Sequence, residues 1–230
     1  MNHFARALHT LLIAGQTLLI VYQSDHSLCI VKPIADPRAI RPASGVFIAL
    51  CWAATLVFII FSANSVKRTV KVDRRWRWGW LLPAVLVAAF LLFRHTIQLP
   101  AFLAAIILPQ AVWIDILADI LGLAGMVFAL WGRVTLGHNW NLYPALKENH
   151  ELIVRGPYQY VRHPMYTGLV SMLLGAVIWY GKAAGFAWFF ACFLGTWFKL
   201  RQEEKLLTAH FGESYGLYKV RVKAIIPFIL

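Results

Sequence analysis

The sequence predicts an all-α integral membrane protein with about six transmembrane helices, and its composition and charge pattern carry that prediction. Of its 230 residues, 60% are hydrophobic and only 14% are charged, and the mean hydropathy is +0.64. A soluble domain of this length seldom has so little polar surface. The net charge of +12 comes from basic residues that lie between apolar runs, so cytoplasmic loops and anionic lipid explain it better than nucleic acid does.

Six apolar runs are long enough to cross a bilayer, which takes about 20 mostly apolar residues in a helix. The predicted spans are 7–30, 46–63, 78–95, 113–132, 165–180 and 184–200. No small-residue cleavage site follows the first run, so it is predicted to be a retained span rather than a signal sequence. Pro100 and Pro109 bracket another apolar stretch, 97–111, which predicts a partial segment on the outer side.

The distribution of basic residues predicts the orientation in the membrane. With the N-terminus, 64–77, 133–164 and the C-terminus in the cytoplasm, 17 of the 22 Lys and Arg lie inside. The segment KRTVKVDRRWR at 67–77 alone carries six of them. The reversed orientation would violate the positive-inside rule.

The last two predicted spans are joined only by Gly181-Lys182-Ala183, which predicts a tight antiparallel hairpin with both ends cytoplasmic. Small residues along these spans would allow close helix contact; they are Gly168, Gly175, Ala176, Gly185, Ala191 and Gly195. The two polar blocks, 133–164 and 199–230, are therefore expected on the same membrane face.

The first block, 133–164, is punctuated by Gly, Pro and Asn and predicts an ordered loop region with at most short helices. By composition alone it would be a solvated interfacial loop. Its histidines are not spaced as ligands on a helix, and Cys29, Cys51 and Cys192 lie far apart, so neither a metal site nor a disulfide is predicted.

The second block begins as a helix that leaves the membrane and ends near Gly212. Lys199, Glu203, Leu206 and Leu207 share one face of this helix. The adjacent carboxylates Glu203 and Glu204 either pair with Lys199 and Arg201 or bind a cationic group.

Two acidic residues lie one turn apart in the fourth span. Asp115 and Asp119 form either a polar site within the membrane or pairs with Arg94 or His95 near the outer surface.

A family resemblance covers roughly residues 132–230. The motifs that carry it are HELI (150–153), Gly156-x-Tyr158, RHPxYxG (162–168), the helical pair, Glu203-Glu204 and FGESYxxYxxRV (211–222) followed by IPFI. In this order and spacing they resemble the isoprenylcysteine carboxyl methyltransferase family, whose wider relatives include the phospholipid N-methyltransferases. Residues 132–230 are accordingly expected to form a methyltransferase core, and 1–131 a set of N-terminal transmembrane helices.

The resemblance implies S-adenosylmethionine as cofactor. No Gly-rich strand–turn–helix fingerprint is present, so the site must be built from the two polar blocks. By similarity, the cofactor-binding residues are His150, Glu151, Leu152, Ile153, Tyr158, Arg162, His163, Pro164, Met165, Tyr166 and Glu203. The family's arginine for the substrate carboxylate falls on Lys199, and Arg201 is the second substrate-binding candidate.

The predicted reaction is carboxyl O-methylation of a prenylated cysteine or a similar lipophilic carboxylate that enters from the bilayer. A carboxylate is already ionised at neutral pH, so no general base is assigned and alignment of donor and acceptor is the catalytic task. The alternatives are N-methylation of a phospholipid or other lipid amine, with Glu204 or His210 as base, or a non-methyltransferase relative that shares the C-terminal fold.

Overall fold

The computed structural model describes residues 40–62, 100–140 and 151–226 with their side chains. It also gives the backbone of helix and strand residues at 10–14, 17–24, 27–30, 37–39, 69–72 and 145–147. The predicted span at 78–95 lies outside the described residues, as does His150.

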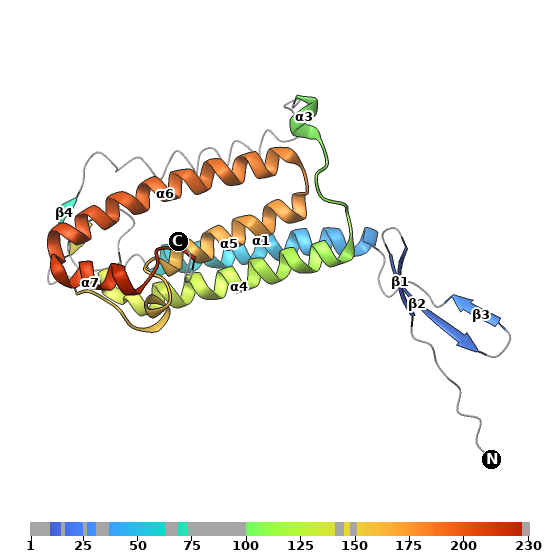
Figure 1. Ribbon diagram of the computed structural model, residues 1–230, viewed down its shortest axis with the longest axis horizontal. Helices are drawn as coiled ribbons and strands as arrows, with labels where there is room; N and C mark the ends of the chain where they lie inside the picture. Colours follow the sequence, from blue (N-terminus) through green and yellow to red (C-terminus); the bar gives the residue numbers. More distant parts are fainter. Residues whose placement is uncertain are drawn as a thin grey trace, which may run out of the picture.

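The long helices in the described part of the chain run along the long axis of the molecule (Figure 1). They are α1 (Pro37–Ser62), α4 (Val112–Leu136), α5 (Pro164–Tyr180) and α6 (Ala183–Phe211). Within the described part of the chain, three helical stretches, 40–62, 112–139 and 183–211, are long and apolar enough to cross a membrane. These helices coincide with the predicted spans at 46–63, 113–132 and 184–200, and α5 coincides with the span predicted at 165–180.

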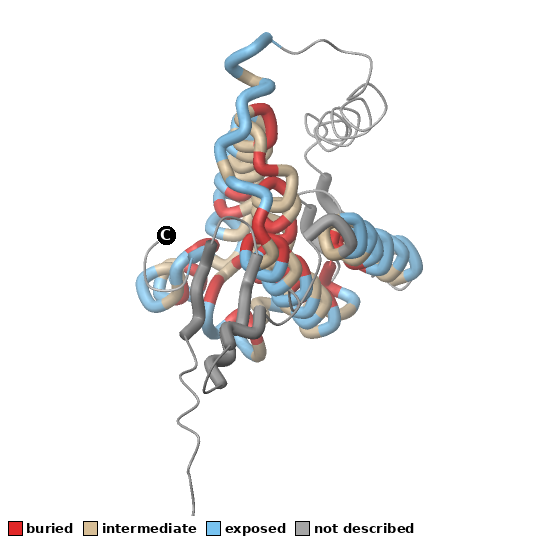
Figure 2. Tube along the Cα trace, turned by 90° about the vertical axis from the view of Figure 1, so that its right-hand side faces the viewer, coloured by how far each residue is buried: buried red, intermediate tan, exposed pale blue. Residues whose placement is uncertain are grey.

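Burial is concentrated where the helices meet, and exposed residues follow their outer faces (Figure 2). Many exposed side chains are large and apolar, including Ile60 at 66%, Phe61 at 73% and Phe190 at 60% of their accessible surface. Soluble proteins rarely expose a continuous apolar surface of this kind. The outer faces of the helices are therefore suited to contact with lipid.

Glycines bring α4 and α5 into close contact. A Cβ added to Gly168 would lie 2.4 Å from the carbonyl oxygen of Gly125, and one added to Gly175 would lie 2.6 Å from that of Ala118. Small residues of this kind let helix backbones approach closely. Gly168 and Gly175, two of the small residues predicted to allow close helix contact, thus face α4, whereas an added Cβ at Gly195 of α6 would meet nothing within 4 Å among the described residues.

The chain turns from α5 into α6 at Gly181, which adopts a left-handed conformation with φ of 72°. The partial segment predicted at 97–111 lies against this turn, as a short helix α3 (Ala101–Ala104) followed by extended backbone. Ile107 N–H donates to Gly181 O at 2.8 Å, and Ala183 N–H donates to Ala105 O at 2.9 Å. From this end α6 diverges from α5 (Figure 1).

The N-terminal region differs from the prediction. Residues 7–30 were expected to form the first membrane-spanning helix, but the structure has three antiparallel strands: β1 (Thr10–Ala14), β2 (Thr17–Ser24) and β3 (Ser27–Ile30). Gly15-Gln16 and Asp25-His26 interrupt the apolar run, and such short breaks between segments rich in Thr, Ile and Val favour strand hairpins.

A second, two-stranded sheet links the two basic loops. Strand β4 (Thr69–Val72) pairs in antiparallel fashion with β5 (Ala145–Lys147). The first polar block otherwise has the expected short helices, 3-10 turns η3 (Gly137–Asn139) and η4 (Gly156–Gln159). The strand pairing was not predicted.

The two polar blocks meet at the end of the bundle where α7 (Glu213–Arg221) follows α6. Gly212 separates the two helices with a positive φ of 54°. The chain after α7 then runs beside the first block, where Arg162 N–H donates to Lys223 O at 2.8 Å and His163 N–H donates to Ala224 O at 3.0 Å. The prediction that both blocks share one end of the bundle is confirmed.

At the opposite end, the acidic residues of α4 bond to α1. Arg41 Nη1 lies 3.1 Å from Asp115 Oδ1, and Ser44 Oγ donates to Asp119 Oδ2 at 2.8 Å. Asp115 is thus paired with an arginine of α1, and Asp119 accepts from a serine of the same helix. The predicted partners Arg94 and His95 lie outside the described residues.

Candidate functional site

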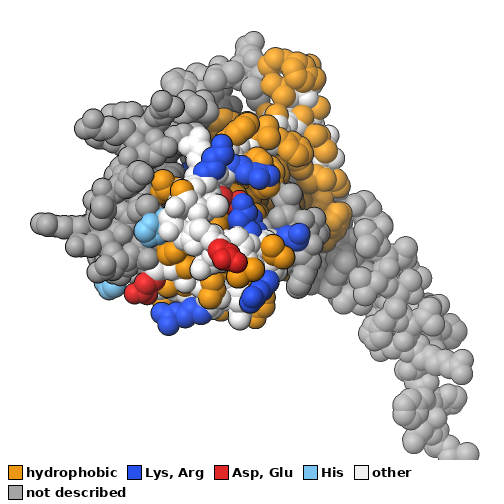
Figure 3. All heavy atoms as spheres, turned by 60° about the vertical axis from the view of Figure 1, so that its left-hand side comes forward, with side chains coloured by type: hydrophobic (Ala, Val, Ile, Leu, Met, Phe, Trp, Pro, Cys, Tyr) orange, Lys and Arg blue, Asp and Glu red, His pale blue; other side chains and the backbone are white. Residues whose placement is uncertain are grey.

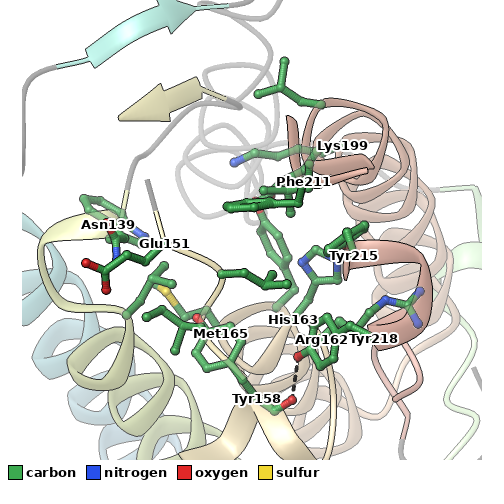
Figure 4. A pocket seen from close by; sticks show the side chains of 18 of the residues that line it. Asn139, Glu151, Tyr158, Arg162, His163, Met165, Lys199, Phe211, Tyr215 and Tyr218 are labelled. Carbon is green, nitrogen blue, oxygen red and sulfur yellow. Dashed lines mark hydrogen bonds between the residues drawn. The ribbon is translucent and has the colours of Figure 1, made fainter. Parts of the chain in front are cut away.

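A cavity lies between the loop around 151–153 and the ends of α5 and α6 that are predicted to face the cytoplasm. Ten of the thirteen residues predicted for the site line it: Glu151, Leu152, Ile153, Tyr158, Arg162, His163, Met165, Tyr166, Lys199 and Glu203. They come from both polar blocks, and Figure 4 shows several of them pointing into one space from opposite sides. The sequence motifs thus converge on a single cavity.

One wall of the cavity combines a carboxylate, a phenol and an ammonium group. Tyr166, in the first turn of α5, donates its hydroxyl hydrogen bond to Glu203 Oε2 at 3.1 Å. Lys199, one helical turn before Glu203, holds its Nζ 5.3 Å from the centre of the Tyr166 ring. The wall therefore presents a negative charge and a positive charge side by side. Both groups contact Tyr166, Glu203 at the phenol hydroxyl and Lys199 at the face of the ring.

Glu204, the neighbour of Glu203, faces away from this wall and is buried in an ion-pair network. Arg162 Nε donates to Glu204 Oε1 at 2.8 Å, Lys219 Nζ lies 3.2 Å from Oε2, and His163 Nε2 lies 3.5 Å from Oε1. Arg162 also donates to the carbonyl oxygens of Lys219 and Val222. Glu204 thus fastens α6 to the motif at 162–163 and to the segment after α7.

Three tyrosines stiffen the side of the cavity formed by η4 and α7. The hydroxyl of Tyr218 donates to the backbone oxygen of Tyr158, and the Tyr158 hydroxyl donates to Gly132 O at 3.4 Å. Burial raises the pKa of Tyr158, of Tyr215 and of Tyr218 well above the ordinary value of a phenol. All three hydroxyls consequently remain protonated hydrogen-bond donors at neutral pH.

Polar atoms in the cavity wall are suited to a polar ligand. Asn139 Oδ1 and Tyr215 Oη are buried, and neither has a hydrogen-bond partner among the described residues. Buried polar atoms are usually satisfied, so such groups mark a place where a ligand or water completes the bonding. Together with the carboxylate of Glu203, they fit a ligand that carries both a cationic centre and hydrogen-bonding groups.

Three of the predicted site residues lie elsewhere. Pro164 is buried at the first position of α5, where it packs near Gly132 of α4, and it does not line the cavity. Arg201 lines a separate hollow on the other side of α6. His150 lies outside the described residues.

Other lining residues were not predicted for the site. They are Ile59, Leu136, Asn139, Trp140, Leu169, Leu206, Leu207, Phe211, Tyr215 and Tyr218. The sequence held a signal for some of them, since Leu206 and Leu207 share the helix face of Glu203, and Tyr215 and Tyr218 are the tyrosines of FGESYxxY. Asn139 and Trp140 had no such signal, because their place depends on the 3-10 turn after α4.

Comparison with known proteins connects this geometry to a family. Residues 113–214, from α4 to the start of α7, match the family model of phospholipid methyltransferases. The protein-S-isoprenylcysteine O-methyltransferase of Xenopus laevis is 29% identical over 53% of this chain and 43% of that protein. Its namesake in Schizosaccharomyces pombe is 35% identical over 42% of each chain.

A longer match extends beyond the core. Protein-S-isoprenylcysteine O-methyltransferase B of Arabidopsis thaliana is 25% identical over 85% of this chain and 98% of that protein. The frog and yeast relatives are matched over less than half of their own length.

A solved structure shares the fold. The eukaryotic intramembrane Ras methyltransferase ICMT aligns with a TM-score of 0.55 and 21% identity, covering 85% of this chain and 69% of that one. The family-model match at 113–214 contains HELI, Gly156-x-Tyr158, RHPxYxG and Glu203-Glu204, and it ends within FGESYxxYxxRV. The chain is therefore similar to protein-S-isoprenylcysteine O-methyltransferases and, over residues 113–214, to the phospholipid methyltransferase family model.

Proposed function

We propose that this protein is a membrane methyltransferase that uses S-adenosylmethionine to methylate the carboxylate of a prenylated cysteine or a similar lipophilic acid. The observation that carries the proposal is the wall formed by Glu203, Tyr166 and Lys199. It offers a carboxylate for a cationic donor and, one helical turn away, an ammonium group for an anionic acceptor. The names of the relatives support the same acceptor.

The residues of the cavity fit the methyl donor. When bound, S-adenosylmethionine supplies an activated methyl group on a positively charged sulfur. Glu203 and the ring of Tyr166 are suited to hold the cationic part of the donor. Asn139 and Tyr215 have buried polar atoms that can complete its hydrogen bonding. The task of the chain is to align two reactants and exclude water, which in ideal systems lowers a barrier by about 7–11 kcal/mol.

The acceptor is proposed to be a carboxylate rather than an amine. Lys199 attracts a carboxylate and repels an ammonium ion at the same wall. An amine would also require a base, and the two sequence candidates are poorly placed for that role. Glu204 is engaged by Arg162 and Lys219, and His210 does not line the cavity.

We further propose that the cavity end of the bundle faces the cytoplasm and that the acceptor enters from the bilayer between α5 and α6. Strands β4 and β5, which belong to the basic segments 67–77 and 133–164, lie at this end (Figure 1), in agreement with the positive-inside rule. The outer face of α6 is apolar, with Leu194 and Phe198 exposed, and would guide a prenyl chain. The predicted division into 1–131 and a methyltransferase core at 132–230 is part of the same proposal.

The proposal is tested by incubating the purified protein with methyl-labelled S-adenosylmethionine and either a farnesylcysteine analogue or a lipid extract. We expect base-labile label on the analogue, as a methyl ester gives. Glu203→Gln should abolish the transfer, and Glu213→Gln, in the exposed first turn of α7, should preserve it. Label on lipid headgroups would establish the amine alternative, and transfer to neither acceptor would contradict both.

A further inference from the structure

A second hollow lies on the opposite side of α6 from the methyl-transfer cavity. Its polar lining consists of Arg162, Arg201, Glu204, Lys219 and Lys223, and the indole of Trp197 forms an apolar wall. Arg162 lines both cavities, and its guanidinium is bonded to Glu204 between them. The two spaces therefore lie back to back at the same end of the bundle.

The hollow carries a surplus of positive charge. Four of its lining residues are cationic, and among the described residues Glu204 is the single carboxylate in the lining. Glu204 is already bonded by Arg162 and lies 3.2 Å from Lys219 Nζ. The charges of Arg201 and Lys223 are therefore not balanced within the hollow. Lys and Arg side chains gather on this end of the molecule beside the apolar surface of the helices (Figure 3).

Both residues that carry the surplus are held in place. The guanidinium of Arg201 lies 4.6 Å from the centre of the Trp197 ring, and Trp197 packs against the core cluster of Leu200, Ala224 and Ile225. The backbone oxygen of Lys223 accepts from Arg162 N–H at 2.8 Å, and Lys223 forms a parallel bridge with Val161. The stacked guanidinium of Arg201 loses little entropy on binding an anion, which favours affinity, and the fixed backbone of Lys223 keeps that lysine beside the hollow.

The position of the hollow indicates the ligand. Trp197 lies where α6 passes from its apolar half to its charged half, and Trp is typical of the membrane–water interface. Arg presents a fork of donors that matches phosphate oxygens, and basic pockets at the cytoplasmic interface bind lipid head groups. We propose that Arg201, Lys219 and Lys223 form a binding site for a phosphate group, as in the head group of an anionic phospholipid at the cytoplasmic face.

The site is tested by counting bound lipids with native mass spectrometry on the full-length protein in detergent, titrated with phosphatidylglycerol or with phosphatidylcholine. The readout does not depend on methyl transfer. We expect one phosphatidylglycerol to bind about tenfold or more tightly than phosphatidylcholine. The double variant Arg201→Gln, Lys223→Gln should lose about tenfold or more of that affinity, and Arg201→Gln alone should lose part of it.

The matched control is Lys205→Gln with Arg221→Gln, which removes the same charge at the same end of the molecule but outside the hollow. It should bind phosphatidylglycerol as the wild type does. A parallel titration with inorganic phosphate shows whether the phosphate group comes from a lipid or from a soluble molecule. If only the binding of inorganic phosphate is weakened by the Arg201 and Lys223 substitutions, the site exists and its ligand is soluble. Equal binding of both lipids together with no phosphate binding, or equal losses in the double variant and the control, would overturn the proposal.

Discussion

At the residue scale, two adjacent glutamates have different tasks because they are about a quarter turn apart on α6. Glu203 faces the cavity and accepts a hydrogen bond from Tyr166. Glu204 is 3% exposed and joins Arg162, His163 and Lys219. From sequence alone either carboxylate could face a ligand, and the choice depends on where the segment after α7 lies. We assign ligand binding to Glu203 and the assembly of the site to Glu204.

This assignment predicts that loss of the Glu204 carboxylate lowers stability, whereas loss of the Glu203 carboxylate weakens binding of the methyl donor. Glu204→Gln leaves Arg162 without its buried anion, and breaking such a pair costs about 3 kcal/mol or more. Its melting temperature in detergent should therefore fall clearly below that of the wild type. Glu203→Gln should melt as the wild type does while losing methyl-donor binding. Equal melting temperatures for both variants would show that Glu204 does not hold the site together.

Lys199 is predicted to select the acceptor. Because a hydrogen bond to a charged group contributes about 1.5–3 kcal/mol, Lys199→Met should raise the KM for a farnesylcysteine analogue by about tenfold or more. Lys199→Arg keeps the charge and should stay within a few-fold of the wild type. Steady-state kinetics at saturating methyl donor give the comparison. An unchanged KM in Lys199→Met would mean that the acceptor carboxylate binds elsewhere.

At the element scale, the frame of the site is the contact between α4 and α5. The sequence predicted these helices closely, because their apolar runs, unlike 7–30, are not interrupted by pairs of polar turn residues. It also predicted the end of α6 near Gly212. Which helix the small residues of α5 contact could not be predicted, since a stripe of glycines indicates a close neighbour without naming it.

The glycine contact gives a prediction of its own. Gly168→Ala places a Cβ against the backbone of α4, and overpacking of this kind costs about 1–3 kcal/mol. The melting temperature should fall, and methyl transfer with it, because α5 carries Tyr166. Gly195→Ala is the matched control, since its added Cβ meets nothing within 4 Å in the described part of the chain. If both substitutions had the same effect on melting, the close packing of α4 on α5 would be refuted.

The N-terminal strands show where prediction from hydrophobicity fails. Residues 7–30 are apolar enough for a span, but their summed hydrophobicity does not reveal the polar breaks at Gly15-Gln16 and Asp25-His26. Three short strands, paired from Thr10 to Ile30, are found there instead. Apolar content alone does not distinguish a buried helix from a strand hairpin when turn residues recur every few positions.

At the scale of the whole molecule, the bundle separates two polar ends. One end holds Glu203, the cavity and the basic hollow, and the other holds the bond between Arg41 and Asp115. The site motifs could be predicted from sequence because they come in a fixed order between residues 150 and 222. The ion-pair network and the polar atoms of Asn139 and Tyr215 could not, because they depend on loops and on α7 folding back.

The orientation is predicted to be cytoplasmic for the cavity end. In a variant without Cys29, Cys51 and Cys192, Lys205→Cys should react with a membrane-impermeant maleimide only from the cytoplasmic side of sealed vesicles. Ala101→Cys, exposed at the start of α3 at the opposite end, should react only from the other side. Reaction of both cysteines from one side would contradict the transmembrane arrangement.

The central claim is that the cavity beside Glu203 binds the methyl donor, and calorimetry of S-adenosylmethionine binding to the purified protein tests it most directly. The wild type and Glu213→Gln should each bind one equivalent with the same affinity. Glu203→Gln should bind at least about tenfold more weakly, because it loses the carboxylate that faces the cationic donor. Unchanged affinity in Glu203→Gln, or no binding by the wild type, would contradict the claim.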